Sequence, residues 1–128
     1  MQPAREDLVD LLLSLTPDDP GVIAKRMFGQ LGLFANGNMY AGVHEADIVL
    51  RLTDDDLAEL LGIDGARPFE PMGRLMREYA CVPAGMVGDL DELESWLARS
   101  LAYARSLPPR AMRRPLPTTQ QQSQARAS

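Results

Sequence analysis

The sequence contains one cysteine and one histidine in 128 residues. A lone cysteine cannot form a disulfide within the chain and cannot build a cysteine-based zinc site. No apolar run approaches the ~20 residues of a membrane-spanning helix, and the N-terminus lacks the basic start of a secretion signal. These absences predict a soluble, cytoplasmic protein with no disulfide framework and no membrane contact.

Hydrophobic residues make up 45% of the chain and charged residues 24%, as in an ordinary globular domain. The charge is unevenly placed. All 18 acidic residues and eight of the 13 basic ones lie within residues 1–104, which therefore carry a net charge of −10. Such a body repels phosphate, so we do not expect it to bind nucleic acid directly.

The last residues differ in composition from the rest. Residues 105–128 carry five arginines and no acid, and four prolines interrupt any helix there. We therefore expect a folded domain over residues 1–107 and a disordered tail, rich in proline, glutamine and arginine, over residues 108–128. The tail serves either as a solubilising end or as a weak, salt-sensitive contact for a polyanion.

Leucines at helical spacing between Pro3 and Pro17 predict a first helix. From Lys25 to Leu52 the apolar period changes to two, which is typical of strands. Asn36-Gly37 lies between two such runs and predicts a two-residue hairpin, because both residues tolerate a positive φ. A second reversal is expected at Glu45-Ala46.

Counting outward from these turns pairs Phe34 with Met39 and Val43 with Ile48. One face of the sheet, expected to pack on helices, then carries Phe34, Met39, Ala41, Val43, Ile48, Leu50 and Leu52. The other carries Leu31, Leu33, Tyr40 and Val49, together with Gly42 and Arg51. That second face is too apolar to lie in water, so we expect a partner to cover it, with a second copy of the chain as the natural one.

Capping patterns mark two later helices, one from Thr53 to about Leu61 and one beginning at Asp89. Between them we expect an edge strand at residues 68–71 and a last strand over residues 76–82. The order is α-β-β-β-α-β-β-α, with connections too short for parallel crossovers. The predicted fold is a two-layer α+β domain with an antiparallel sheet and its helices on one face.

The search for catalytic chemistry gives little. His44 lies at a predicted exposed turn with no partner that would make it a base, and Cys81 alternates with apolar residues as a small core residue would. Asp54, Asp55 and Asp56 favour a helix start and do not converge on one ion. The methionines near strands are expected to fill the core. We find no phosphate-binding loop and no nucleophile motif, and we therefore assign no catalytic, cofactor or metal residue.

The segment Lys25-Arg26-Met27-Phe28-Gly29 permits two interpretations. In the first, Met27 and Phe28 are buried and Gly29 supplies a bend before the hairpin. In the second, the basic pair contacts an anionic group beside an aromatic side chain.

This segment begins a resemblance to a known family. Arg26-Met27-Phe28-Gly29, Gly32-Leu33-Phe34, Asn36-Gly37 and Met39-Tyr40-Ala41 resemble the opening of the N-terminal domain of the TfoX/Sxy competence regulators. Further similarity lies in Val49-Leu50-Arg51-Leu52, Pro68-Phe69, Tyr79-Ala80-Cys81-Val82-Pro83 and Trp96, so that it covers about residues 5–107. Gln30 stands where many members have a second glycine.

The resemblance implies a secretion-chaperone-like α+β domain, often dimeric, without catalytic residues. It also implies a role in positive control of DNA-uptake genes together with the cyclic-AMP receptor protein. Full-length regulators of the family carry a second domain, and the similarity here covers their first half.

Two hypotheses follow. The first is a non-enzymatic interaction module, a homodimer that binds a cyclic-AMP receptor protein-like transcription regulator or RNA polymerase. Its expected interaction surface consists of Lys25, Arg26, Leu31, Leu33, Tyr40 and Val49. The second is a small-ligand-binding protein or an enzyme with a cleft between sheet and helices.

Overall fold

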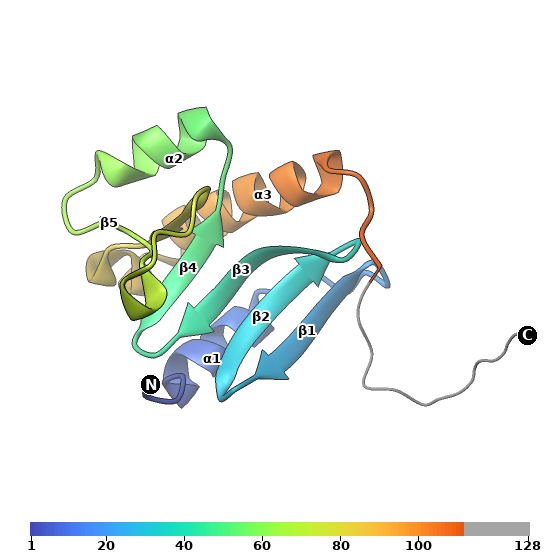
Figure 1. The fold of residues 1–128 in the computed structure, drawn as a ribbon, viewed down its shortest axis with the longest axis horizontal. Helices are drawn as coiled ribbons and strands as arrows, with labels where there is room; N and C mark the ends of the chain where they lie inside the picture. Colours follow the sequence, from blue (N-terminus) through green and yellow to red (C-terminus); the bar gives the residue numbers. More distant parts are fainter. Residues whose placement is uncertain (112–128) are drawn as a thin grey trace, which may run out of the picture.

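The computed structural model describes residues 1–111 and has an α+β fold (Figure 1). Six antiparallel strands form one sheet in the order β1-β2-β3-β4-β6-β5. The strands are β1 (Val22–Met27), β2 (Gln30–Ala35), β3 (Asn38–His44), β4 (Asp47–Arg51), β5 (Arg67–Pro68) and β6 (Tyr79–Cys81). The helices are α1 (Glu6–Ser14), α2 (Asp54–Leu61) and α3 (Leu90–Ser106), with short 3₁₀ turns at η1 (Pro71–Gly73) and η2 (Ala84–Gly88).

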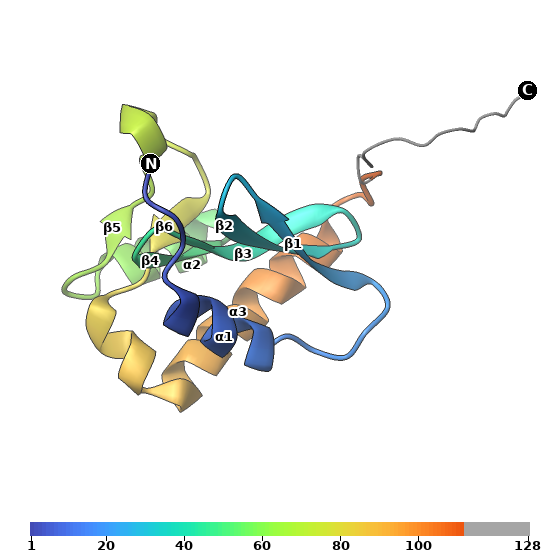
Figure 2. The ribbon, with the colours of Figure 1, turned by 90° about the horizontal axis from the view of Figure 1, so that it is seen from below.

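Helices α1 and α3 cover one face of the sheet, as predicted, and α2 lies beside β6 (Figure 2). The core lies between this face and the two helices. Leu12 of α1, Leu50 of β4 and Leu93 of α3 are fully buried there. No described helix covers the opposite face, which we call the outer face.

Both capped helices begin where the sequence predicts. The side chain of Thr53 accepts a hydrogen bond from the amide of Asp56, and that of Asp89 accepts one from the amide of Glu92, each at 3.2 Å. These bonds satisfy amides that the first turn of a helix leaves unpaired. The three aspartates therefore lie at the start of a helix, as expected.

Strand β1 was not among the predicted elements. It pairs with β2 along its whole length and is joined to it by the two-residue turn Phe28-Gly29. Because β1 is an edge strand, four of its six residues are exposed and its sequence lacks the alternation of a half-buried strand. The observed order is therefore α-β-β-β-β-α-β-β-α.

The predicted faces of the first hairpin are right for Ala41 and Val43 and wrong for Leu31, Leu33, Phe34, Met39 and Tyr40. Phe34 does pair with Met39, but the register then shifts, so that Leu33 pairs with Ala41. This β-bulge places one extra residue, Tyr40, on β3 and turns it toward the same side as Ala41. Leu33 and Tyr40 consequently lie under α3, whereas Phe34 and Met39 lie on the outer face.

Three further expectations need correction. The last strand is shorter than predicted, because only residues 79–81 pair with β4. Helical spacing predicts a buried stripe on this last helix at Leu90, Leu93, Leu97, Leu101 and Ala104, but Leu90 is 49% exposed and does not belong to it. Met72 and Met76 do not fill the core, since they lie in the irregular segment between β5 and β6 with exposed side chains.

The residues that follow α3 form hydrogen bonds with the β2–β3 turn. The Pro108 carbonyl accepts a hydrogen bond from the Asn38 side chain, and the amide of Arg110 donates one to the Asn36 carbonyl. Of the predicted tail, residues 112–128 lie outside the described part of the chain.

Candidate functional site

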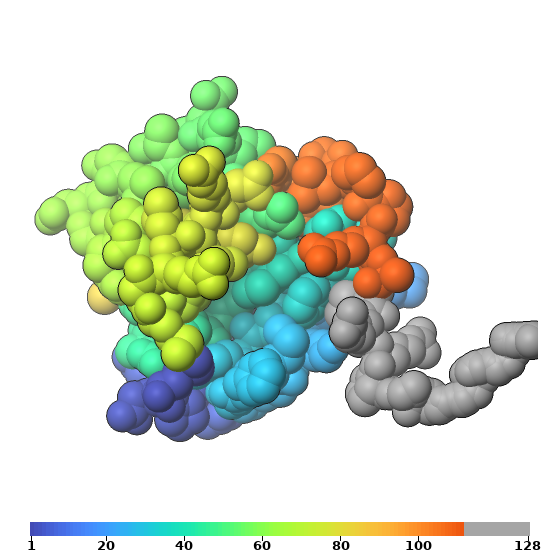
Figure 3. Space-filling model, viewed as in Figure 1, coloured from blue at the N-terminus to red at the C-terminus, as the bar shows by residue number. Residues whose placement is uncertain are grey.

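The outer face holds the largest cavity found in residues 1–111, with a volume of about 670 Å³. Figure 3 shows this face, on which the segment between β5 and β6 stands above the neighbouring strands. We call this space the outer cavity. Its lining comes from the N-terminus, the β3–β4 turn, β5 with the segment after it, and β6.

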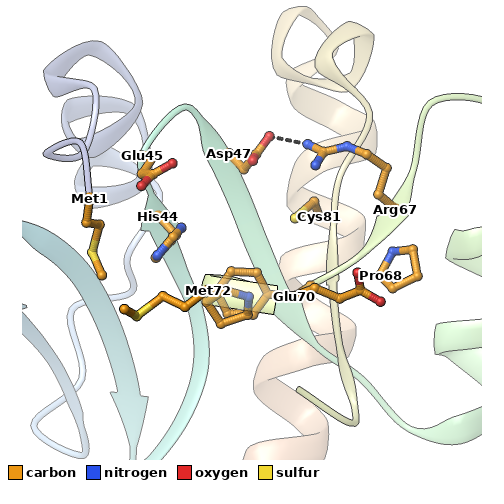
Figure 4. A pocket seen from close by; sticks show the side chains of 11 residues that line it. Met1, His44, Glu45, Asp47, Arg67, Pro68, Glu70, Met72 and Cys81 are labelled. Atoms are coloured by element: carbon orange, nitrogen blue, oxygen red, sulfur yellow. Dashed lines mark hydrogen bonds and ion pairs between the residues drawn. The ribbon is translucent and has the colours of Figure 1, made fainter. Parts of the chain in front are cut away.

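The N-terminal segment connects the two turns beside the outer cavity. The amide of Gln2 donates to the Glu45 carboxylate, and the Gln2 carbonyl accepts from the side-chain amide of Gln30 at 2.6 Å. The Gln30 side chain also accepts from the amide of Glu45 at 2.7 Å. Gln30 therefore helps to place Met1 in the cavity wall (Figure 4).

Two aromatic side chains, His44 and Phe69, line the outer cavity. The imidazole of His44 meets the ring of Phe69 edge-on, with the ring centroids 5.1 Å apart, and Phe69 in turn lies 6.3 Å from Tyr79. His44 Nε2 is buried and has no hydrogen-bond partner. The turn does not leave His44 as exposed as predicted, because Phe69 folds over it.

Cys81 lies in the same cavity and is buried, which agrees with its predicted role as a small apolar residue. Burial, reinforced by the nearby carboxylate of Asp47, raises the pKa of its thiol to about 11. A thiol with that pKa is almost wholly protonated at neutral pH and is a poor nucleophile. No hydrogen bond joins it to His44 in the described structure, so the two residues do not form a catalytic pair.

The cavity is acidic at its rim. Asp47 forms an ion pair with Arg67, as the dashed line in Figure 4 marks. Glu45 and Glu70 also line the space, and Arg67 is its one basic residue. The lining side chains therefore sum to a charge of −2 with His44 neutral, and the α-amino group of Met1 brings the lining to −1. Such a site favours a ligand or partner that brings positive charge together with apolar surface.

A smaller cleft of about 170 Å³ lies between the sheet and α3. Its lining is mostly apolar, with Glu94 the one charged residue and Tyr40 contributing its ring. A ligand site normally adds several convergent polar groups to an apolar lining. The hypothesis of a small-ligand-binding protein or an enzyme would place its ligand in this cleft between sheet and helices. The cleft offers few polar groups to bind one.

The structure separates the residues of the predicted interaction surface. Leu31, Leu33 and Tyr40 are at most 4% exposed, and their side chains belong to the core beneath the helices. Val49 does lie on the outer face, as predicted, where it lines a small apolar hollow with Phe69.

Lys25 and Arg26, the basic part of that surface, lie on the edge strand β1. Arg26 forms an ion pair of 2.8 Å with Glu6 on α1. The six residues therefore do not form one exposed patch.

Sequence reasoning missed the most exposed apolar residues. Phe28 is 94% exposed at the β1–β2 turn, which overturns the interpretation that buries it. Met72, in η1, is 88% exposed and lines the outer cavity. The sequence signal for an exposed Phe28 was the glycine that follows it. Phe28-Gly29 forms a two-residue turn of the same kind as Asn36-Gly37.

A sequence comparison matches residues 15–104 to the TfoX N-terminal domain. The chain belongs to the TfoX N-terminal domain family. The match begins just after α1 and ends within α3, so the TfoX N-terminal domain includes the whole sheet. It also includes the Phe28 turn and every residue of the outer cavity except Met1. A search of curated proteins found no match.

The TfoX N-terminal domain is generally a non-catalytic regulatory domain. Within residues 1–111, no cluster of three or more histidine, cysteine or acidic side chains is arranged to hold a metal ion. No helix in that range is long and apolar enough to cross a membrane.

Proposed function

We propose that the chain is a non-enzymatic protein-interaction module that acts as a homodimeric adaptor in transcription control of the competence type. The observation that carries this proposal is the match to the TfoX N-terminal domain over residues 15–104. Family membership supports a regulatory role, and the raised pKa of the buried Cys81 thiol argues against a catalytic nucleophile at the largest cavity.

The proposed partner is a cyclic-AMP receptor protein-like regulator or RNA polymerase. The chain carries a formal net charge of −5, which disfavours direct contact with the DNA backbone. It would therefore act on promoters through a DNA-binding protein. Exposed acidic side chains outside the outer cavity, such as Asp18 and Asp54, would meet basic residues of that partner, which mainly raises the association rate and the specificity.

The test uses purified proteins. The full chain is immobilised, and a cyclic-AMP receptor protein-like regulator and RNA polymerase from the same cell are passed over it separately after nuclease treatment. We expect saturable binding of one of them that weakens as salt is raised. Asp18→Asn and Asp54→Asn should weaken binding, whereas Glu94→Gln on α3 should not. Absence of binding to both proteins would contradict the adaptor role.

A second candidate function is small-ligand binding at the outer cavity. The observation that favours it is His44 Nε2, a buried polar atom without a partner in a space of about 670 Å³. A ligand that offers this nitrogen a hydrogen bond would stabilise the fold by mass action. Thermal-shift screening of small cations and metabolites tests this candidate. A compound that raises the Tm of wild type but not that of His44→Phe would favour ligand binding at the outer cavity over the adaptor role.

A further inference from the structure

Phe28 occupies a position where the backbone favours a different residue. The β1–β2 and β2–β3 turns share one geometry, with φ of 52° and 80° at Phe28-Gly29 and 51° and 83° at Asn36-Gly37. The first residue of such a turn is typically asparagine, aspartate or glycine, because it needs a positive φ. Phe28 accepts the strained conformation and projects a 94% exposed ring into solvent. The turn itself therefore does not explain the aromatic side chain.

The outer cavity lies next to this turn. The amide of Ala4 donates to the Gly29 carbonyl, so the segment that carries Met1 into the cavity wall also touches the tip of the hairpin. Figures 1 and 2 both place the N-terminus, the β1–β2 turn and η1 at the same end of the molecule. A projecting ring and an open, partly apolar cavity thus lie side by side on one surface.

We propose that the outer cavity receives Phe28 of a second copy of the chain, and that the two copies exchange this contact reciprocally across a two-fold axis. A two-fold interface uses the same patch on both copies, so it requires a projection and a matching recess in one patch. Phe28 is the projection, and Met1, Phe69 and Met72 are the apolar walls of the recess.

Charge and shape support a second copy as the occupant. Phe28 follows Lys25 and Arg26 on its hairpin, with Arg26 also paired to Glu6, whereas the side chains that line the cavity sum to −2, or to −1 with the α-amino group of Met1. Met72 is 88% exposed and flexible, and methionine adapts its shape to an incoming aromatic ring. The reciprocal arrangement buries two aromatic anchors in one interface, and buried aromatic residues dominate binding energy at interfaces.

This inference rests on the homodimer part of the proposed function and not on the identity of the regulator. Its first test is light scattering of the full chain at micromolar concentration. Wild type should give twice 14.1 kDa. Phe28→Asn suits the turn and should keep the fold, yet it should raise the dissociation constant of the dimer roughly 30-fold or more. Leu90→Asn, which changes an exposed leucine on α3, should leave the dimer intact.

The second test locates the contact. In a Cys81→Ala background, Phe28→Cys chains are mixed with Met72→Cys chains and treated with a short bis-maleimide. We expect mixed cross-linked pairs in excess over those formed between Phe28→Cys and Leu90→Cys chains. A monomeric wild type overturns the inference. So does a dimer that survives Phe28→Asn and gives no excess of mixed pairs, an outcome that leaves the adaptor role untouched.

Discussion

Arg51 Nε on β4 donates a hydrogen bond of 2.8 Å to the carboxylate of Glu78, just before β6. The other carboxylate oxygen accepts a hydrogen bond from the Tyr103 hydroxyl on α3, also at 2.8 Å. The guanidinium of Arg51 lies over the rings of both Tyr79 and Tyr103. These contacts join the sheet to α3, and they give the first prediction.

Glu78→Gln should lower the free energy of unfolding by about 1 kcal/mol at pH 7, a value kept small because the side chain is 34% exposed. Burial raises the pKa of Glu78, but hydrogen bonds from Tyr103 and Arg51 outweigh burial, so this pKa lies below its usual value. A depressed pKa stabilises the fold above the unfolded value of about 4.3 and loses that effect as the pH falls.

The difference between wild type and Glu78→Gln should therefore be constant from pH 7 to about 5 and shrink below about pH 4. Urea-induced unfolding at a series of pH values measures it. Glu94→Gln, at an exposed position on α3, is the control and should change the free energy of unfolding by less than about 0.5 kcal/mol. A difference that persists undiminished at pH 3 would show that the charge of Glu78 is not involved.

Leu33→Ala tests the corrected face of the first hairpin. Leu33 is 1% exposed beneath α3, so its truncation should cost about 3 kcal/mol of unfolding free energy. Leu90→Ala, at a 49% exposed position on α3, should cost less than about 0.5 kcal/mol in the same urea titration. Were Leu33 on the outer face, as the simple register predicts, its truncation would cost little.

The thiol of Cys81 should resist modification in the folded protein. With a pKa of about 11, roughly one thiol in a thousand is ionised at pH 8. Reaction with an aromatic disulfide reagent, followed by absorbance, should be about 100-fold slower or more in native buffer than in denaturing urea. Equal rates under the two conditions would mean that Cys81 is exposed and reactive.

Gly37→Ala should destabilise the fold by roughly 1–3 kcal/mol, because φ at Gly37 is 83° and a Cβ there would clash with the Arg110 carbonyl. Gly85→Ala is the matched control, since no atom lies within 4 Å of a Cβ at that position. Thermal unfolding of the two variants measures the difference. Equal Tm values would mean that residues after α3 do not pack on the β2–β3 turn.

Local signals in the sequence predicted most of the fold. Side-chain caps at Thr53 and Asp89 and the turn residues Asn36-Gly37 act over three or four positions, so they can be interpreted without knowing the tertiary structure. The bulge at Tyr40 could not be predicted in this way. The bulge depends on which side chains pack beneath α3, a helix distant in sequence. No residue near Tyr40 signals the bulge locally.

The candidate site was harder to predict than the fold. Phe28 and Met72 are apolar, and a pattern of hydrophobicity assigns such residues to the core. Their exposure follows from a left-handed backbone at both positions, with φ of 52° and 56°. His44 and Phe69 are distant in sequence and meet because the segment after β5 folds back over β3 and β4. Only the three-dimensional structure brings them together.

The most direct test of the outer face as the interaction surface is a dilution series of the isotope-labelled full chain, followed by amide NMR. The account predicts concentration-dependent shifts at Phe28, Gly29, Phe69 and Met72, with the outer surfaces of α2 and α3 unchanged. Shifts confined to α2 or α3, or spectra that do not change with concentration, would contradict it.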